Sequence, residues 1–291
     1  MKAIKLASVF AVSAVAAAVS TSTFAAEPVF SGTAGIEYTS YYGDSKAKGD
    51  LADGTDIGEI EISVDTGVVY AELEIAGTDD DENVDIGLEK LYVKQGAVSF
   101  GRFDGSVAAG AFMGMDEIGY TGLDLRTEQG DTDNTGVRYA VAPGLKVALE
   151  ATSNTATEDS EVGVALSYVA DLEGVKLGIS GGVLEDSNSV NVGAQFNAGP
   201  ATVSVNYGVG ERWDKDNSVW IDAEEAGFGV EFAATEALTL TLQYANELEA
   251  DEDGTYFIAA YKAGDLTYYF ENYNGEYAGM EANIVGVKAS F

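Results

Sequence analysis

The stretch KLYVKQGAVSFGRF, residues Lys90 to Phe103, opens the part of the chain that decides the fold. An insert of about thirty irregular residues follows, DGSVAAGAFMGMDEIGYTGLDLRTEQGDTD from Asp104 to Asp133, and after it comes NTGVRYAVAPGLKVALEAT. The flanking segments alternate like hairpin strands, whereas the insert is far longer than any other connection. A connection of that length in a compact protein usually has a function. We therefore expect it to fold into the bore of a barrel and narrow it.

Alternation of apolar and polar residues at a period of two recurs along the mature chain, in sixteen segments of about ten residues. Ile57 to Asp65 alternates clearly, Val84 to Gln95 alternates irregularly, and Glu211 to Trp220, with both tryptophans, is expected to be a polar loop. Tight turns interleave with mostly longer acidic loops, which is typical of an outer-membrane barrel. The predicted fold is all-β, a 16-stranded antiparallel transmembrane β-barrel with an inward-folded constriction loop after strand 5.

A soluble β-sandwich, or a tandem array of small sandwiches, is the alternative fold, because its strands alternate in the same way. Two observations favour the barrel. The alternation runs the whole length without a linker or a break in composition, and several tyrosines, such as Tyr168 and Tyr244, fall near segment ends. An aromatic girdle at a membrane interface would place tyrosines there.

The first 26 residues have the pattern of an export signal. Met1 to Ala26 contains Lys2 and Lys5, then an apolar and small-residue run, then a small-residue cleavage region. A transmembrane helix is the alternative, but the run is short and interrupted by serines. We expect cleavage of residues 1–26 and a single barrel domain over residues 27–291.

Composition excludes several classes of function. Removal of the signal leaves 13 of the 15 basic residues and all 49 acidic ones, for a formal charge of −36. Such a surface repels nucleic acid and attracts cations. The chain has neither Cys nor His, so disulfides, thiolate chemistry, imidazole bases and the commonest zinc ligands are lacking. We expect no enzyme activity, no cofactor and no metal.

The hairpin KLYVKQGAVSFGRF, the insert after it, the hairpin GVRYAVAPGLKVALEAT and the terminal Phe291 together resemble the Gram-negative general diffusion porin family. The resemblance implies an outer-membrane homotrimer with water-filled channels for passive diffusion of small hydrophilic solutes and ions. It also implies contact with outer-membrane lipid and lipopolysaccharide, and a barrel-assembly machinery for which Phe291 is the assembly signal. The chain departs from the family in lacking a Pro-Glu-Phe-Gly-type stretch in the insert, and in having Ala289 where an aromatic often stands.

In the resembled family, acids on the inserted loop face basic residues on the opposite wall of the bore. The candidate pore-constriction residues here are Arg102, Asp104, Asp116, Glu117, Asp124, Arg126 and Arg138, with Glu128 as a further loop carboxylate. Simple alternation places Arg102 on the lipid face, where it could snorkel to the interface, unless a bulge at Gly101 turns it inward. Arg126 is either a constriction charge or an internal clasp of the loop.

The predicted acidic lining of the lumen consists of Glu59, Glu61, Glu72 and Glu74. With few positive charges to offset them, the channel should prefer cations. Two alternative functions stay open: a solute-specific channel, for example for sugars, and a non-conducting surface barrel or exported β-sandwich acting as an adhesin or structural protein. In either channel reading the protein is located in the outer membrane of a Gram-negative bacterium.

Overall fold

The computed structural model describes residues 27–43, 49–52, 59–77, 84–110, 122–127, 135–154, 159–185, 187–214, 217–275 and 281–291. The expected signal segment and three insert carboxylates, Asp116, Glu117 and Glu128, lie outside these residues. The strand segments are β1 (Val29–Tyr41), β2 (Gly49–Ala52), β3 (Glu59–Asp65), β4 (Val69–Gly77), β5 (Val84–Gln95), β6 (Val98–Arg102), β7 (Thr135–Ala142), β8 (Leu145–Asn154), β9 (Asp159–Leu172), β10 (Val175–Leu184), β11 (Ser187–Ala198), β12 (Ala201–Asp214), β13 (Val219–Ala233), β14 (Leu238–Glu247), β15 (Glu252–Ala263), β16 (Leu266–Asn274) and β17 (Ala282–Ser290). Among the described segments, no helix is long and apolar enough to cross a membrane.

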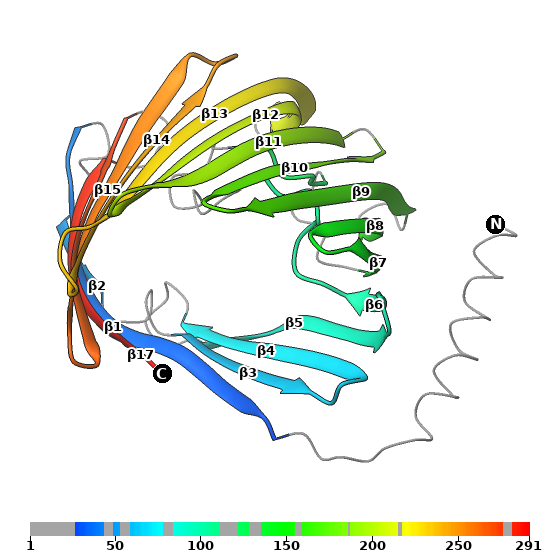
Figure 1. The fold of residues 1–291 in the computed structure, drawn as a ribbon, viewed down its shortest axis with the longest axis horizontal. Coiled ribbons are helices and arrows are strands. Elements are labelled where there is room, and N and C mark those ends of the chain that lie inside the picture. The colour runs from blue at the N-terminus through cyan, green and yellow to red at the C-terminus, as the bar shows by residue number, and fades with distance from the viewer. Residues whose placement is uncertain are drawn as a thin grey trace, which may run out of the picture.

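The strands form one closed antiparallel sheet, because β1 pairs with β17 as well as with its sequence neighbours (Figure 1). The loop-side half of β1 pairs with β2 and its first half pairs with β3, so these two segments occupy one position in the wall. The 17 segments therefore make a wall of sixteen strands. The predicted 16-stranded antiparallel barrel is confirmed. Closure pairs every strand on both sides and leaves no open edge.

Each strand carries an apolar row on one face and a small or polar row on the other. On β9 the apolar row is exposed, as at Val164 with 55% of its surface accessible, whereas Gly163 and Ala165 on the other row are buried. The polar row makes the contacts with the insert, whose blue-green trace runs within the ring of strands in Figure 1. The polar row thus faces the bore and the apolar row faces outward.

A β-bulge explains the irregular alternation of Val84 to Gln95. Glu72 of β4 pairs with Lys90, but the next residue, Leu73, pairs with Leu88, so Glu89 has no partner in the register. The extra residue shifts the alternation by one position. Leu88 and Leu91 can therefore both lie on the exposed apolar row, although they are three positions apart in the sequence.

The prediction of a polar loop from Glu211 to Trp220 is wrong. β12 continues to Asp214 and β13 already begins at Val219, so only a tight connection remains. Trp213 pairs directly with Trp220, and their rings meet edge to face with centroids 5.4 Å apart. Cross-strand aromatic pairs stabilise a sheet, which allows these strands to continue through polar residues.

Candidate functional site in the barrel bore

The described parts of the insert form two legs that lie together, residues 103–110 leaving β6 and residues 122–127 returning toward β7. Leu125 donates its backbone N–H to the carbonyl of Ala108 at 3.0 Å, and Gly110 donates to the carboxylate of Asp124 at 2.5 Å. The legs approach most closely at Gly110 and Gly122, where an added Cβ on Gly110 would lie 2.3 Å from the backbone of Gly122. Only glycine permits this approach.

Amide and hydroxyl side chains of β10, β11 and β12 hold the insert to the wall. Asn191 of β11 is buried and binds Leu123 at two points, accepting its N–H at 2.8 Å and donating to its carbonyl at 2.8 Å. Ser180 of β10 donates to the carbonyl of Ala109 at 2.7 Å, and Asn206 of β12 donates to that of Gly110 at 3.0 Å. The wall thereby supplies the partners that the backbone of an irregular segment needs when it is buried.

The root of the insert is clamped by two charged side chains. Glu150 of β8, which is buried, accepts hydrogen bonds from the Ser106 hydroxyl at 2.5 Å and the Val107 N–H at 2.8 Å. Arg138 of β7 donates to the carbonyl of Gly105 at 2.6 Å, and its guanidinium lies 4.2 Å from the centroid of the Phe103 ring. These contacts fix the first turn of the insert relative to β7 and β8.

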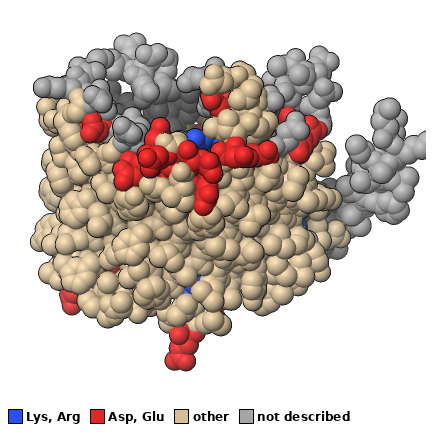
Figure 2. Space-filling view, turned by 90° about the horizontal axis from the view of Figure 1, so that it is seen from above, with Lys and Arg blue, Asp and Glu red and all other residues tan. Residues whose placement is uncertain are grey.

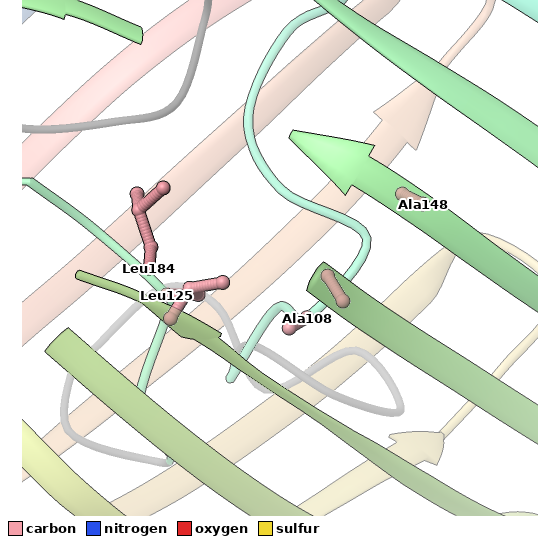
Figure 3. Close-up of a cluster of buried hydrophobic side chains, with 5 residues drawn as sticks. Ala108, Leu125, Ala148 and Leu184 are labelled. Atoms are coloured by element: carbon pink, nitrogen blue, oxygen red, sulfur yellow. The ribbon is translucent and has the colours of Figure 1, made fainter. Parts of the chain in front are cut away.

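A small apolar cluster completes the docking (Figure 3). Leu125 and Ala108 of the insert pack with Ala148, Ala165 and Leu184 of the wall, and all five are buried. Apart from Leu184, the wall residues of this cluster are small. At Gly182 of β10, an added Cβ would come within 2.7 Å of a Leu125 methyl group. Small side chains on the bore side of β8, β9 and β10 thus leave room for the insert.

Of the two arginines expected on the wall, the structure brings only Arg138 to the insert. Arg102 pairs with Leu91 on the exposed apolar row, and its Nε donates to the carbonyl of Glu89 at 3.3 Å. Gly101 has a positive φ of 143°, yet the β5–β6 register is unbroken from Gln95 to Leu91, so no bulge turns Arg102 inward. We therefore leave Arg102 out of the proposed lining.

The charges on the described parts of the insert are bound within it or to the wall. Asp124 and Arg126 form an ion pair at 3.1 Å, which matches the clasp alternative for Arg126. Asp104 lies 3.4 Å from the ammonium of Lys90 on β5. The two residues expected at the narrowest point, Asp116 and Glu117, lie outside the described residues.

Three of the four glutamates expected to line the lumen lie on the row opposite the exposed apolar residues of β3 and β4. Glu61 pairs with Glu74 across these strands and accepts a hydrogen bond from the Ser31 hydroxyl at 3.0 Å. Glu72 is buried, bonds the Tyr70 hydroxyl and forms an ion pair with Lys90 at 2.5 Å. The side chain of the fourth, Glu59, lies outside what the structure describes.

Sequence reasoning missed a column of three stacked aromatic rings with a cation at each end on this sector. The rings of Tyr70, Tyr92 and Phe103 stack in succession, with centroid separations of 5.1 and 4.8 Å. Lys94 lies over the outer ring of Tyr70 at 5.9 Å, and Arg138 covers Phe103 at the other end. Cations favour the faces of aromatic rings, so the column stabilises both charges. The i, i+2 spacing of Tyr92 and Lys94 was visible in the sequence, but the bulge at Glu89 hid which row they occupy.

The far sector of the bore, formed by β1 and β12 to β17, carries further polar groups that sequence reasoning missed. The hydroxyl of Tyr269 donates to Glu37 at 2.6 Å, and Lys288 lies 5.1 Å from the same ring. Glu225 and Glu247 are a directly opposed and buried pair on β13 and β14. Glu225 accepts the backbone N–H of Gly122, which links the returning leg of the insert to this wall.

The terminal Phe291 takes part in barrel closure. Its backbone exchanges two hydrogen bonds of 3.0 Å with Gly32, beyond the last pair of the β1–β17 register, and its side chain is 63% exposed. An exposed terminal aromatic fits the proposed assembly signal.

No family model matches the chain, and no curated protein matches it in sequence. Solved structures match it in three dimensions. A mutant of the Rh. blastica porin superimposes with a TM-score of 0.65 at 16% identity, over 91% of this chain and 100% of that one. OmpF of Salmonella typhi in complex with daunomycin gives a TM-score of 0.64 at 12% identity, over 91% of this chain and 98% of that one.

A third match is OmpT, an outer membrane protein of Vibrio cholerae, in a trimer form. It gives a TM-score of 0.57 at 17% identity, over 92% of this chain and 99% of that one. Each match extends over nearly the whole barrel, although few residues are identical. The chain therefore has the porin fold.

Proposed function

We propose that the protein is an outer-membrane porin that forms a water-filled channel for passive diffusion of small hydrophilic solutes and ions. The observation that carries this proposal is the arrangement of the two rows. Large apolar side chains face outward on nearly every strand, and carboxylates, amides, hydroxyls and cations face the bore, where an ordered insert docks. A soluble sandwich would bury its apolar rows against each other, whereas a membrane barrel turns them toward lipid.

The insert is proposed to narrow the bore. A sixteen-stranded barrel is wide enough to leave an aqueous channel, so the size of solutes depends on what occupies its middle. The docked legs hold the ends of the segment that contains Asp116 and Glu117, through Asn191 and Arg138 among others. Those two acids are proposed as loop-side charges of the constriction.

Cation preference is proposed from the balance of charge in the bore. Away from the turn end, Glu61, Glu74 and Glu247 face the bore in addition to Glu72, whose charge Lys90 offsets. Of the arginines expected to offset the carboxylates, Arg138 is engaged in a clamp and Arg102 lies on the outer row. Rings of acidic side chains bias a pore toward cations.

The remaining proposals concern location and partners. If the protein is a porin, it is exported through a cleaved signal and resides in the outer membrane of a Gram-negative bacterium. There it contacts lipopolysaccharide and is assembled by a barrel-assembly machinery. A homotrimer is proposed because a protein with the same fold occurs in a trimer form. Transport rather than catalysis is proposed as the activity.

The test is planar-bilayer recording on the purified and refolded protein. Stepwise conductance that rises with salt is expected, with a reversal potential of the sign for cation preference in a KCl gradient. If no conductance steps occur under conditions in which a refolded control porin conducts, the channel proposal is wrong and the non-conducting surface barrel takes its place. Sugar block of the current would instead indicate a solute-specific channel. The aromatic column gives that alternative no support, because its rings cover one another and cations cover both ends.

A further inference from the structure

The end of the bore at the short turns carries a ring of lysines. Each lies within three residues of a tight turn or of the chain end, on β5, β8, β10, β15 and β17, so that the set extends around much of the wall. These residues are Lys94, Lys146, Lys176, Lys262 and Lys288. They make up five of the 15 basic residues in the chain.

The strand register places the first two of these lysines on the row that faces the bore. Lys94 pairs with Ser99, which pairs in turn with the insert clamp Arg138. Arg138 pairs with Ala148 in the apolar docking cluster, and Lys146 lies two residues before Ala148 on the same strand. Directly opposed residues and residues two apart share a face of a sheet.

The other three lysines occupy the same row farther around the wall. Lys176 lies four residues before Ser180, whose hydroxyl binds the insert. Lys262 and Lys288 both pair with Thr267, on either side of β16. The ammonium of Lys288 lies over the ring of Tyr269, two residues from Thr267, and that tyrosine binds Glu37 across the bore-facing row.

On the bore-facing row at this end, three carboxylates accompany the five lysines. Asp65 is paired with Lys94 at 2.6 Å, Asp171 lies opposite Lys176 in the register, and Glu231 lies near the end of β13. Four more side-chain carboxylates, Glu27, Glu173, Glu236 and Asp265, lie in the turns or before β1, beyond the strand ends. Among the described residues, Lys146, Lys176 and Lys262 are exposed and have no carboxylate within 4.0 Å, so their ammonium groups are available to a ligand.

The opposite end of the barrel is acidic. Figure 2 shows Asp and Glu side chains gathered in a band near the upper edge of the wall. Strands β12, β13 and β15 carry Glu211, Asp222, Glu224 and Asp253 toward the ends where the longer connections leave. The charge of the barrel therefore changes along its axis, from carboxylate-rich at the loop end to lysine-rich in the bore at the turn end.

We propose, building on the channel function above, that the turn-side mouth of the bore is a binding site for small multivalent anions, such as phosphate-bearing solutes. An ammonium is a compact, strongly hydrated charge on a flexible stem. Lys262 and Lys288 flank Thr267 on its two neighbouring strands, about 10 Å apart across the sheet, so these two side chains can approach one polyanion together. The Debye length is about 10 Å at 0.1 M salt and falls to about 3 Å at 1 M. The lysines should therefore attract an anion jointly only at low salt. Because the other end repels anions, binding should depend on the side of addition.

The test is block of the channel by inorganic tripolyphosphate, added to one side of a planar bilayer at a time. Orientation is assigned with the variant Asn217→Cys, whose thiol is unique because the chain has no cysteine and which lies at the loop end between β12 and β13. Biotinylation of that thiol and addition of streptavidin to one chamber identify the loop side. At about 0.1 M KCl, the half-blocking concentration is expected to be about tenfold lower from the turn side than from the loop side.

The variant Lys146→Gln/Lys176→Gln/Lys262→Gln should lose this difference between the two sides and keep its conductance. The matched control, Lys46→Gln/Lys48→Gln/Lys215→Gln, removes the same charge from the β1–β2 and β12–β13 connections and should retain the difference. The anion-site proposal is wrong if the unchanged protein is blocked equally from both sides, or if the side-dependent block persists in the first triple variant. Either result leaves the channel proposal intact. Absence of any conductance overturns the channel proposal itself.

Discussion

Replacement of Asn191 by Ala should release the returning leg of the insert from the wall. The Asn191 amide is the partner of both the N–H and the carbonyl of Leu123, each at 2.8 Å, and both residues are buried. Leaving a buried polar group without a partner costs about 1–3 kcal/mol. Water from the bore can replace part of the loss, so we expect the lower part of the range for two groups, about 2–3 kcal/mol in all. At about 1.4 kcal/mol per tenfold, the undocked population should rise roughly 30- to 140-fold.

Hydrogen exchange measured by mass spectrometry detects this change directly, because water reaches the bore while proteases do not. Peptides that cover residues 122–127 should exchange faster in the Asn191→Ala variant, and peptides from β12 should be unchanged. The matched control is Asn188→Ala on the same strand, because that side chain binds Glu211 at 2.5 Å and not the insert. Unchanged exchange at residues 122–127, or equal acceleration in the control, would refute the assignment of Asn191 as the anchor.

Three further changes test the insert and the charge balance. Leu125→Ala removes the largest insert side chain of the docking cluster. The free energy of unfolding should fall by about 2 kcal/mol, the low end for a core leucine, because one side of the cluster adjoins the bore. This loss should appear as a lower unfolding temperature. Lys90→Gln leaves two neighbouring carboxylates without their cation, so the reversal potential in a KCl gradient should shift toward stronger cation preference; a shift toward anions would contradict the charge balance. Asp116→Asn/Glu117→Gln should lower cation preference, and an unchanged reversal potential would place the constriction charges elsewhere.

Alternation was enough to predict the wall of the barrel, because it is a local property of each strand. A one-residue slip in pairing would turn apolar side chains into the bore, so a strong alternating pattern also fixes the register. Prediction was weaker where the pattern was broken. The bulge at Glu89 concealed the inward row of β5, and with it the two lysines of that strand. The tryptophan pair extends β12 and β13 through residues whose polarity indicated a loop.

The candidate site was predictable only in part, because its partners lie far apart in the sequence. The sequence indicated that the insert carries acids, and the family resemblance implied that Arg138 faces them from the opposite wall. Only the folded barrel brings Asn191, Glu150 and Glu225 to the insert backbone. The role of Arg138 likewise depends on Gly105 and Phe103, which turn it from a freely lining charge into a clamp.

By itself, the sequence determined that this chain is an all-β barrel of sixteen strands with one long insert after the fifth, because a period of two encodes which face of a strand is apolar. The tertiary structure decided where that insert rests and which charges remain available in the bore. Those properties depend on closure of the sheet, which brings β5, β8, β10, β15 and β17 around one opening and gathers their lysines at its turn end. No local pattern records that arrangement, because each strand contributes a single lysine to the ring.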